Sequence, residues 1–157
     1  MYVANLARIG AWVELSRLQA YNRTGATLNK GDVVAVDILA SSTEATKVAE
    51  GGETSGFANV ISMATANIGR ILVVCDDDAV EDNGLGNFVI HGVVEVEVNG
   101  DTGLDAGEKL VGTDGQTYLS EWASGGNVVG LLLEDAEASA TTKLAIFDGM
   151  AWRSEDT

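Results

Sequence analysis

The 157-residue sequence has no proline, one cysteine, one histidine and nine basic side chains against 24 acidic ones. The lone Cys75 excludes a disulfide within the chain, and with only His91 beside it no Cys/His set for a zinc site can form. The first twenty residues carry Arg8 and Arg17 and contain no unbroken apolar run, and no later stretch is long enough to span a membrane. We therefore expect neither a secretory signal nor a membrane segment.

The net charge of −15 is unevenly distributed along the chain. Residues 1–30 hold four basic side chains and one acidic one, whereas residues 31–157 hold five basic and 23 acidic ones. A body this acidic repels nucleic acid, so we expect no nucleic-acid partner. The basic segment at the start has the sign that suits docking on an acidic protein surface.

Nineteen glycines take over the turn-making that proline would otherwise share. Several follow Asn or Asp, as in Asn83-Gly84, Asn99-Gly100, Asp114-Gly115 and Asp148-Gly149. Such pairs tolerate the positive φ of two-residue hairpin turns. Turns at these short intervals predict an antiparallel all-β domain.

Short β-branched runs between the turns predict the strands. We expect strands over residues 33–39, 57–62, 70–75, 88–98, 109–112, 117–119, 128–134 and 143–147. In the longest run, Val94, Val96 and Val98 alternate with polar residues, which is the period of a half-buried strand. Gly92 within this run predicts a bulge or bend. The nearly continuous apolar run 128–133 predicts a central strand covered on both faces.

A short phrase occurs twice, as LNKGDVV at 28–34 and as LDAGEKLV at 104–111. Similar strand and loop patterns follow each copy, so we expect two similar halves, about 24–74 and 102–147. Together they predict one small β-barrel or sandwich over 24–149. Residues 1–23 are interpreted as an extended N-terminal arm with some strand, and residues 150–157 as a C-terminal tail.

The acidic run from Asp76 to Asp82 is the strongest candidate for a chemical site. Clustered carboxylates can bind Ca²⁺, but Val80 occupies a position where the EF-hand pattern needs an oxygen donor. A solvated acidic loop is the favoured interpretation. The sequence contains no nucleophile elbow and no phosphate-binding glycine loop. We predict no catalytic residue, no metal site and no cofactor.

Aromatic and arginine residues gather near the two ends of the chain. Trp, Tyr and Arg are the residue types that dominate the binding energy of protein interfaces. The predicted interface residues, for a partner or a sister subunit, are Tyr2, Arg8, Trp12, Arg17, Tyr21, Arg23, Trp152 and Arg153.

Four segments in order resemble the capsid cement, or decoration, proteins of tailed bacteriophages. These segments are 22–34, 90–96, 104–110 and 128–133, and the resemblance covers about 22–147. It implies a non-enzymatic β-domain on the outer surface of a phage head. It also implies two partners: the major capsid protein, whose lattice it stabilises, and the chain itself, as a homotrimer or a dimer.

Two other functions stay open at this point. A host-attachment or carbohydrate-binding module, such as a head fibre or tail component, would use Trp122 and Tyr118 to stack on sugars. A hydrolase would use paired carboxylates from the loop that runs from Asp76 to Asp82.

Overall fold

A computed structural model describes residues 15–37, 58–64, 71–99, 103–137 and 139–150. These residues form strands joined by turns and loops, and none of them is helical. The strands are β1 (Ser16–Asn22), β2 (Val33–Val36), β3 (Ala58–Ile61), β4 (Leu72–Cys75), β5 (Leu85–Val98), β6 (Lys109–Gly112), β7 (Leu119–Glu121), β8 (Val128–Leu132) and β9 (Thr141–Asp148). The predicted all-β fold is confirmed.

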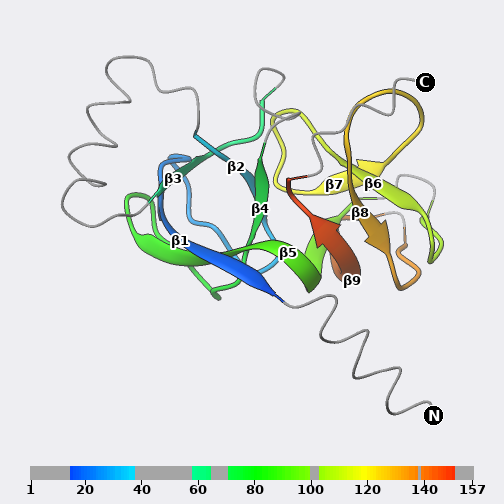
Figure 1. Ribbon diagram of the computed structural model, residues 1–157, viewed down its shortest axis with the longest axis horizontal. Coiled ribbons are helices and arrows are strands. Elements are labelled where there is room, and N and C mark those ends of the chain that lie inside the picture. Colours follow the sequence, from blue (N-terminus) through cyan, green and yellow to red (C-terminus); the bar gives the residue numbers. More distant parts are fainter. Residues whose placement is uncertain (1–14, 38–57, 65–70, 100–102, 138, 151–157) are drawn as a thin grey trace, which may run out of the picture.

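The strand pairings close two rings that share β5 (Figure 1). The N-terminal ring runs β1-β3-β2-β4-β5, and a β1–β5 pairing closes it. The C-terminal ring runs β5-β7-β6-β8-β9, and a β5–β9 pairing closes it. The pairs β1–β3 and β5–β7 are parallel, whereas the other pairs are antiparallel.

The strand β5 is long because it serves both rings. Its first half pairs with β1 from Leu85 to His91, and its second half pairs with β9 from His91 to Val98. Gly92, with a φ of 134°, lies where the strand passes from one ring to the other. The predicted bend is therefore present, and a side chain at this φ would be strained.

The repeated phrase forms the same turn in each ring. Asp32 accepts a hydrogen bond from the backbone N–H of Asn29 at 2.7 Å, and its own N–H donates to the Asn29 carbonyl at 3.0 Å. Glu108 makes the same two bonds to Asp105, at 2.9 and 3.2 Å. The glycine before each acid has a positive φ, 96° in the first copy and 99° in the second. The repeated phrase therefore builds the same turn in both rings.

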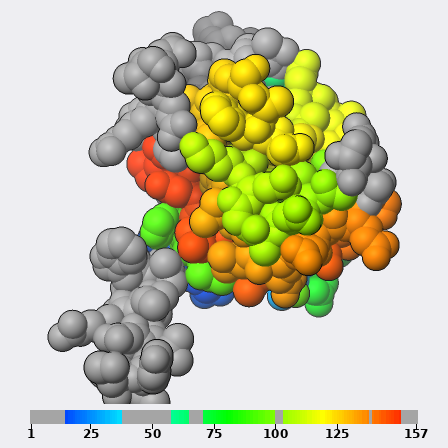
Figure 2. Space-filling model, turned by 90° about the vertical axis from the view of Figure 1, so that its right-hand side faces the viewer, coloured from blue at the N-terminus to red at the C-terminus, as the bar shows by residue number. Residues whose placement is uncertain are grey.

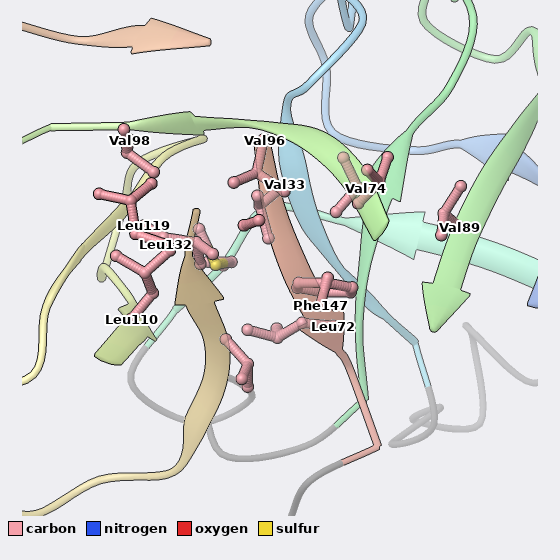
Figure 3. Packing of buried hydrophobic residues seen from close by; sticks show 14 of the residues in the cluster. Val33, Leu72, Val74, Val89, Val96, Val98, Leu110, Leu119, Leu132 and Phe147 are labelled. Carbon is pink, nitrogen blue, oxygen red and sulfur yellow. The ribbon is translucent and has the colours of Figure 1, made fainter. Parts of the chain in front are cut away.

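The core consists of two clusters, one in each ring. The cluster of the C-terminal ring extends to the facing sides of β2 and β4 in the N-terminal ring (Figure 3). Both of these strands are buried along their whole length, because one face of each packs into its own ring and the other face packs against the neighbouring ring.

The prediction that residues 128–133 are covered on both faces is wrong. Leu131 and Leu133 are each 38% exposed. The strand β8 lies between β6 and β9, on the side of the C-terminal ring that no described strand covers. An apolar run alone does not separate an inner strand from an outer one.

Candidate interaction surfaces

The acidic loop is held together by its own carboxylates. Asp76 forms an ion pair with Arg17, with 2.9 Å between Oδ2 and Nη2. Asp77 accepts the backbone N–H of Asn87 at 2.8 Å, and Asp82 accepts a backbone N–H from the β1–β2 loop at 3.1 Å. Within the described ranges, no group of three or more His, Cys, Asp or Glu side chains is placed to hold a metal ion. Asp76, Asp77 and Asp82 thus bind groups of the protein itself.

Three of the eight predicted interface residues belong to the described part of the chain. Arg17 and Tyr21 lie on β1, and Arg23 follows it directly. The segment interpreted as an arm therefore includes a strand of the N-terminal ring. The other five predicted residues lie outside the described residues: Tyr2, Arg8, Trp12, Trp152 and Arg153.

The basic groups of this strand make contacts within the N-terminal ring. The Arg23 guanidinium lies 5.3 Å from the centre of the Tyr21 ring, and its Nη1 donates to the side-chain oxygen of Asn83. Arg17 keeps 52% of its side chain exposed beside Asp76. Arg17 is therefore the residue of the three that is most accessible to a partner.

The two aromatic residues of the carbohydrate hypothesis lie on either side of β7. The Lys109 ammonium lies over the Trp122 ring, 4.9 Å from its centre. Tyr118 and Trp122 are both half-buried, and the Trp122 Nε1 is fully buried. The cation thus occupies one face of the indole and removes that face from sugar stacking.

The lone cysteine and histidine do not form a nucleophile–base pair. Burial raises the pKa of the Cys75 thiol to about 11, which keeps it protonated and unreactive. His91 contacts Asp148 at 3.8 Å between Nδ1 and Oδ1, and both side chains are well exposed. The described residues thus show no activated nucleophile at either position.

A buried carboxyl group lies where the two rings meet. The Asp32 turn lies against β5, because the Gly31 carbonyl accepts the backbone N–H of Glu97 at 2.8 Å. Thr117, from the β6–β7 loop, donates its hydroxyl to Glu97 at 3.0 Å. Burial raises the pKa of Asp32 from 3.8 to about 6, and the nearby Glu97 charge adds to the rise. Nothing in the sequence distinguishes this acid from its counterpart Glu108.

The Asp32 pKa predicts a pH-dependent stability. The Asp32 carboxyl group binds its proton more tightly in the folded chain than in the unfolded chain. Protonation of Asp32 therefore stabilises the fold, and this contribution is complete below about pH 4 and is lost as the pH rises through about 6. Asp32→Asn is expected to increase the free energy of unfolding at pH 7 by about 1–2 kcal/mol and to flatten the dependence between pH 4 and 7. Urea melts at several pH values measure this.

Asp32→Ala provides the control for the charge. Alanine also removes the charge but loses the acceptor for the Asn29 N–H. It should therefore gain less stability at pH 7 than Asp32→Asn. A wild-type stability that rises between pH 4 and 7, with no gain in Asp32→Asn, would contradict the account.

No protein-family model and no curated protein matches the chain. Among solved structures, it is similar to the N base of the head fibre gp8.5 in bacteriophage phi29. The TM-score is 0.51 at 11% sequence identity, and the match covers 87% of this chain and 97% of the other. The likeness shows that the two proteins share a fold. In the described residues, no helix is long and apolar enough to cross a membrane.

Proposed function

We propose that this chain is a non-enzymatic structural protein of a phage virion that binds the outer surface of the head and stabilises the lattice of the major capsid protein. The shared fold with a phage head-fibre base carries this proposal, because the match covers nearly the whole of both chains. The resemblance to cement proteins, which rests on different evidence, suggests the same particle.

The charge and the contacts of the acidic residues support a binding role. An excess of acid keeps a protein soluble when many copies crowd on one surface. The carboxylates of the acidic loop bind Arg17 and backbone N–H groups, so they serve the turn. These contacts make a hydrolase based on this loop a poor fit.

The test is binding to heads that lack the protein. Purified chain is mixed with bare heads and sedimented, and the bound amount is measured against concentration. Saturable binding together with greater resistance of the heads to heat is expected. An absence of binding at concentrations well above those found in the particle would overturn the proposal.

A second candidate is the base of a head fibre, and the solved structure that shares the fold favours it. A fibre base anchors another part and has no need to strengthen the shell. Saturable binding with no change in the heat resistance of the heads would favour this function over cementing.

The N-terminal residues before β1 are expected to carry part of the capsid contact. Removing residues 1–14 leaves β1 intact, because this strand begins at Ser16. We expect affinity for bare heads to fall at least tenfold, since aromatic and arginine residues are lost from this segment. The melting temperature of the free protein is the control, and unchanged affinity and occupancy would refute this role.

A further inference from the structure

The strand β1 ends against the last turn of the acidic loop. The Asn83 N–H donates to the Asn22 carbonyl at 2.7 Å, and the Asn22 N–H donates to the Gly84 carbonyl at 2.9 Å. The Gly84 N–H closes the turn by donating to the Glu81 carbonyl at 2.8 Å. Asn83 has a φ of 65°, which asparagine tolerates better than most residues. Asn83 and Gly84 are thus held in one backbone conformation.

The side chain of Asn83 is held at both atoms of its carboxamide. The Oδ1 atom accepts a hydrogen bond from Arg23 Nη1, and the Nδ2 atom donates to Asp82 Oδ2 at 2.7 Å. We call the contacts that Asn22 and Arg23 make with Asn83 and Gly84 the clasp. Asn83 itself is exposed, so water reaches the clasp from outside.

An asparagine followed by glycine carries a reaction of its own, and asparagine is among the residues that limit the lifetime of proteins. The glycine nitrogen attacks Cγ of the asparagine and forms a succinimide. The bond from Cγ to Nδ2 breaks, and Nδ2 leaves as ammonia with the proton that the glycine nitrogen gives up. Water then opens the succinimide at either carbonyl carbon, which gives aspartate or isoaspartate. Glycine favours the attack because no side chain hinders its nitrogen.

The clasp keeps the reacting nitrogen and carbon apart. The Gly84 nitrogen must release its hydrogen bond to Glu81 before it attacks, because this bond stabilises the protonated amide. The Asn83 side chain must also leave Arg23 and Asp82 before its Cγ can turn towards that nitrogen. The reaction therefore needs a local opening of the turn, and its rate falls with the fraction of molecules that are open.

Two other described glycines follow an acidic residue and have their nitrogen bound in the same way. Gly115 and Gly149 each follow an aspartate, and their N–H groups donate to the carbonyls of Met63 and Ile90 at 2.9 and 2.8 Å. An ionised carboxylate resists attack by nitrogen more strongly than a neutral carboxamide does. Asn83 is therefore the most reactive of these three positions.

The equivalent loop of the C-terminal ring shows that the fold does not require this pair. The β8–β9 loop takes the equivalent place, because Leu104 bridges to Ala136 as Leu28 bridges to Val80. Its residues, 133–140, include no asparagine and no glycine. Figure 2 looks onto the C-terminal ring, where this loop is coloured orange. The reactive pair is thus a particular feature of the β4–β5 loop.

We propose that Asn83 is a latent modification site, at which opening of the clasp lets the Gly84 nitrogen displace ammonia from the side chain. The closed clasp keeps this reaction slow in the native fold. The isoaspartate product has an extra methylene in the backbone before Gly84, so the turn cannot close again on the Glu81 carbonyl in the same geometry. The modification is therefore irreversible and weakens the contact between β1 and the acidic loop.

Deamidation of full-length protein, folded in buffer and unfolded in urea, tests the proposal. Mass spectrometry follows the mass gain of the peptide that contains Asn83, and chromatography separates its aspartate and isoaspartate forms. The folded wild type should react at least about tenfold more slowly than the unfolded chain, since the ratio of the two rates reports the opening of the clasp. Equal rates in the two states, or no reaction at Asn83 in the unfolded chain, would overturn the proposal.

Arg23→Ala tests the clasp directly, because it removes the donor to Asn83 Oδ1. The rate in the folded variant, divided by the rate in the same variant unfolded, should rise about fivefold over the wild-type ratio. Arg17→Ala is the matched control, since it removes an arginine of the same strand that binds Asp76 instead. Its ratio should equal that of the wild type.

Asp82→Ala is the second test, because it removes the acceptor of Asn83 Nδ2. It should also raise the ratio, and it decides the question if Arg23→Ala does not fold. Circular dichroism melts establish which variants are folded under the conditions of the assay. A folded Arg23→Ala or Asp82→Ala with the wild-type ratio, or an equal rise in Arg17→Ala, would show that the clasp does not control the reaction.

Discussion

Gly149→Ala is expected to destabilise the fold by about 3 kcal/mol or more, because an added Cβ here meets the closest backbone contact among the glycines that the structure describes. Gly149 lies just after β9, where its N–H donates to Ile90 at 2.8 Å and its carbonyl accepts the N–H of Leu72 at 3.0 Å. A Cβ at this position would lie 1.7 Å from the backbone oxygen of Leu72. Backbone atoms held on both sides cannot move away as a flexible side chain would. Urea unfolding followed by tryptophan fluorescence measures the loss.

Gly125→Ala is the matched control. This glycine has a φ of 66° and nothing within 4 Å of an added Cβ, so alanine there bears only the strain of the left-handed backbone. That strain costs about 1–2 kcal/mol. Equal losses in the two variants would show that close packing at Gly149 is not the cause.

Phe147→Ala should lower the free energy of unfolding by about 3–5 kcal/mol and destabilise both rings together. Phe147 is fully buried on β9, in the cluster that also includes Val33 and Val74 of the N-terminal ring. The cavity therefore opens at the junction of the rings. Unfolding should remain a single transition at a lower midpoint, whether it is followed by circular dichroism or by fluorescence.

Phe147→Leu separates the effect of volume from that of the residue type. Leucine fills most of the volume that the phenylalanine ring occupies, so this variant should lose about 1–1.5 kcal/mol of unfolding free energy. Two separate transitions in Phe147→Ala, with only one of them shifted, would show that the rings fold independently and that the junction does not couple them.

Local patterns in the sequence predict the strands of this fold well. The alternation of Val94, Val96 and Val98 with polar residues places these valines in the core, where each is less than 10% exposed. Gly92 predicts the bend, and the doubled phrase predicts two similar turns. Each of these signals depends only on residues that are close together in the chain, so it can be recognised without knowing which strands pair.

The arrangement of the strands depends on contacts between distant residues, and the sequence does not predict it. Nothing in the run from Leu85 to Val98 shows that its halves close different rings. The strand β1 is inconspicuous because its inward positions include Ala20 and Asn22, which are small or polar. Leu131 has the same local pattern as an inner strand residue, and only the ring order places it outside.

Exposure at equivalent positions differs between the two rings, and sequence alone does not predict the difference. Val74 and Leu131 occupy equivalent positions, yet the first is fully buried and the second is 38% exposed. The difference comes from the neighbouring ring, which covers only one of them. Exposure at this position is therefore a property of the assembled fold.

The binding of purified chain to bare heads tests the central claim most directly. The proposal implies that a phage carries the gene, so heads of that phage are used, and bound protein is counted per head by sedimentation and mass spectrometry. The account predicts saturable binding with a fixed number of copies per head and heads that break open at a higher temperature. No saturable binding, with correctly folded protein and intact heads, would contradict it.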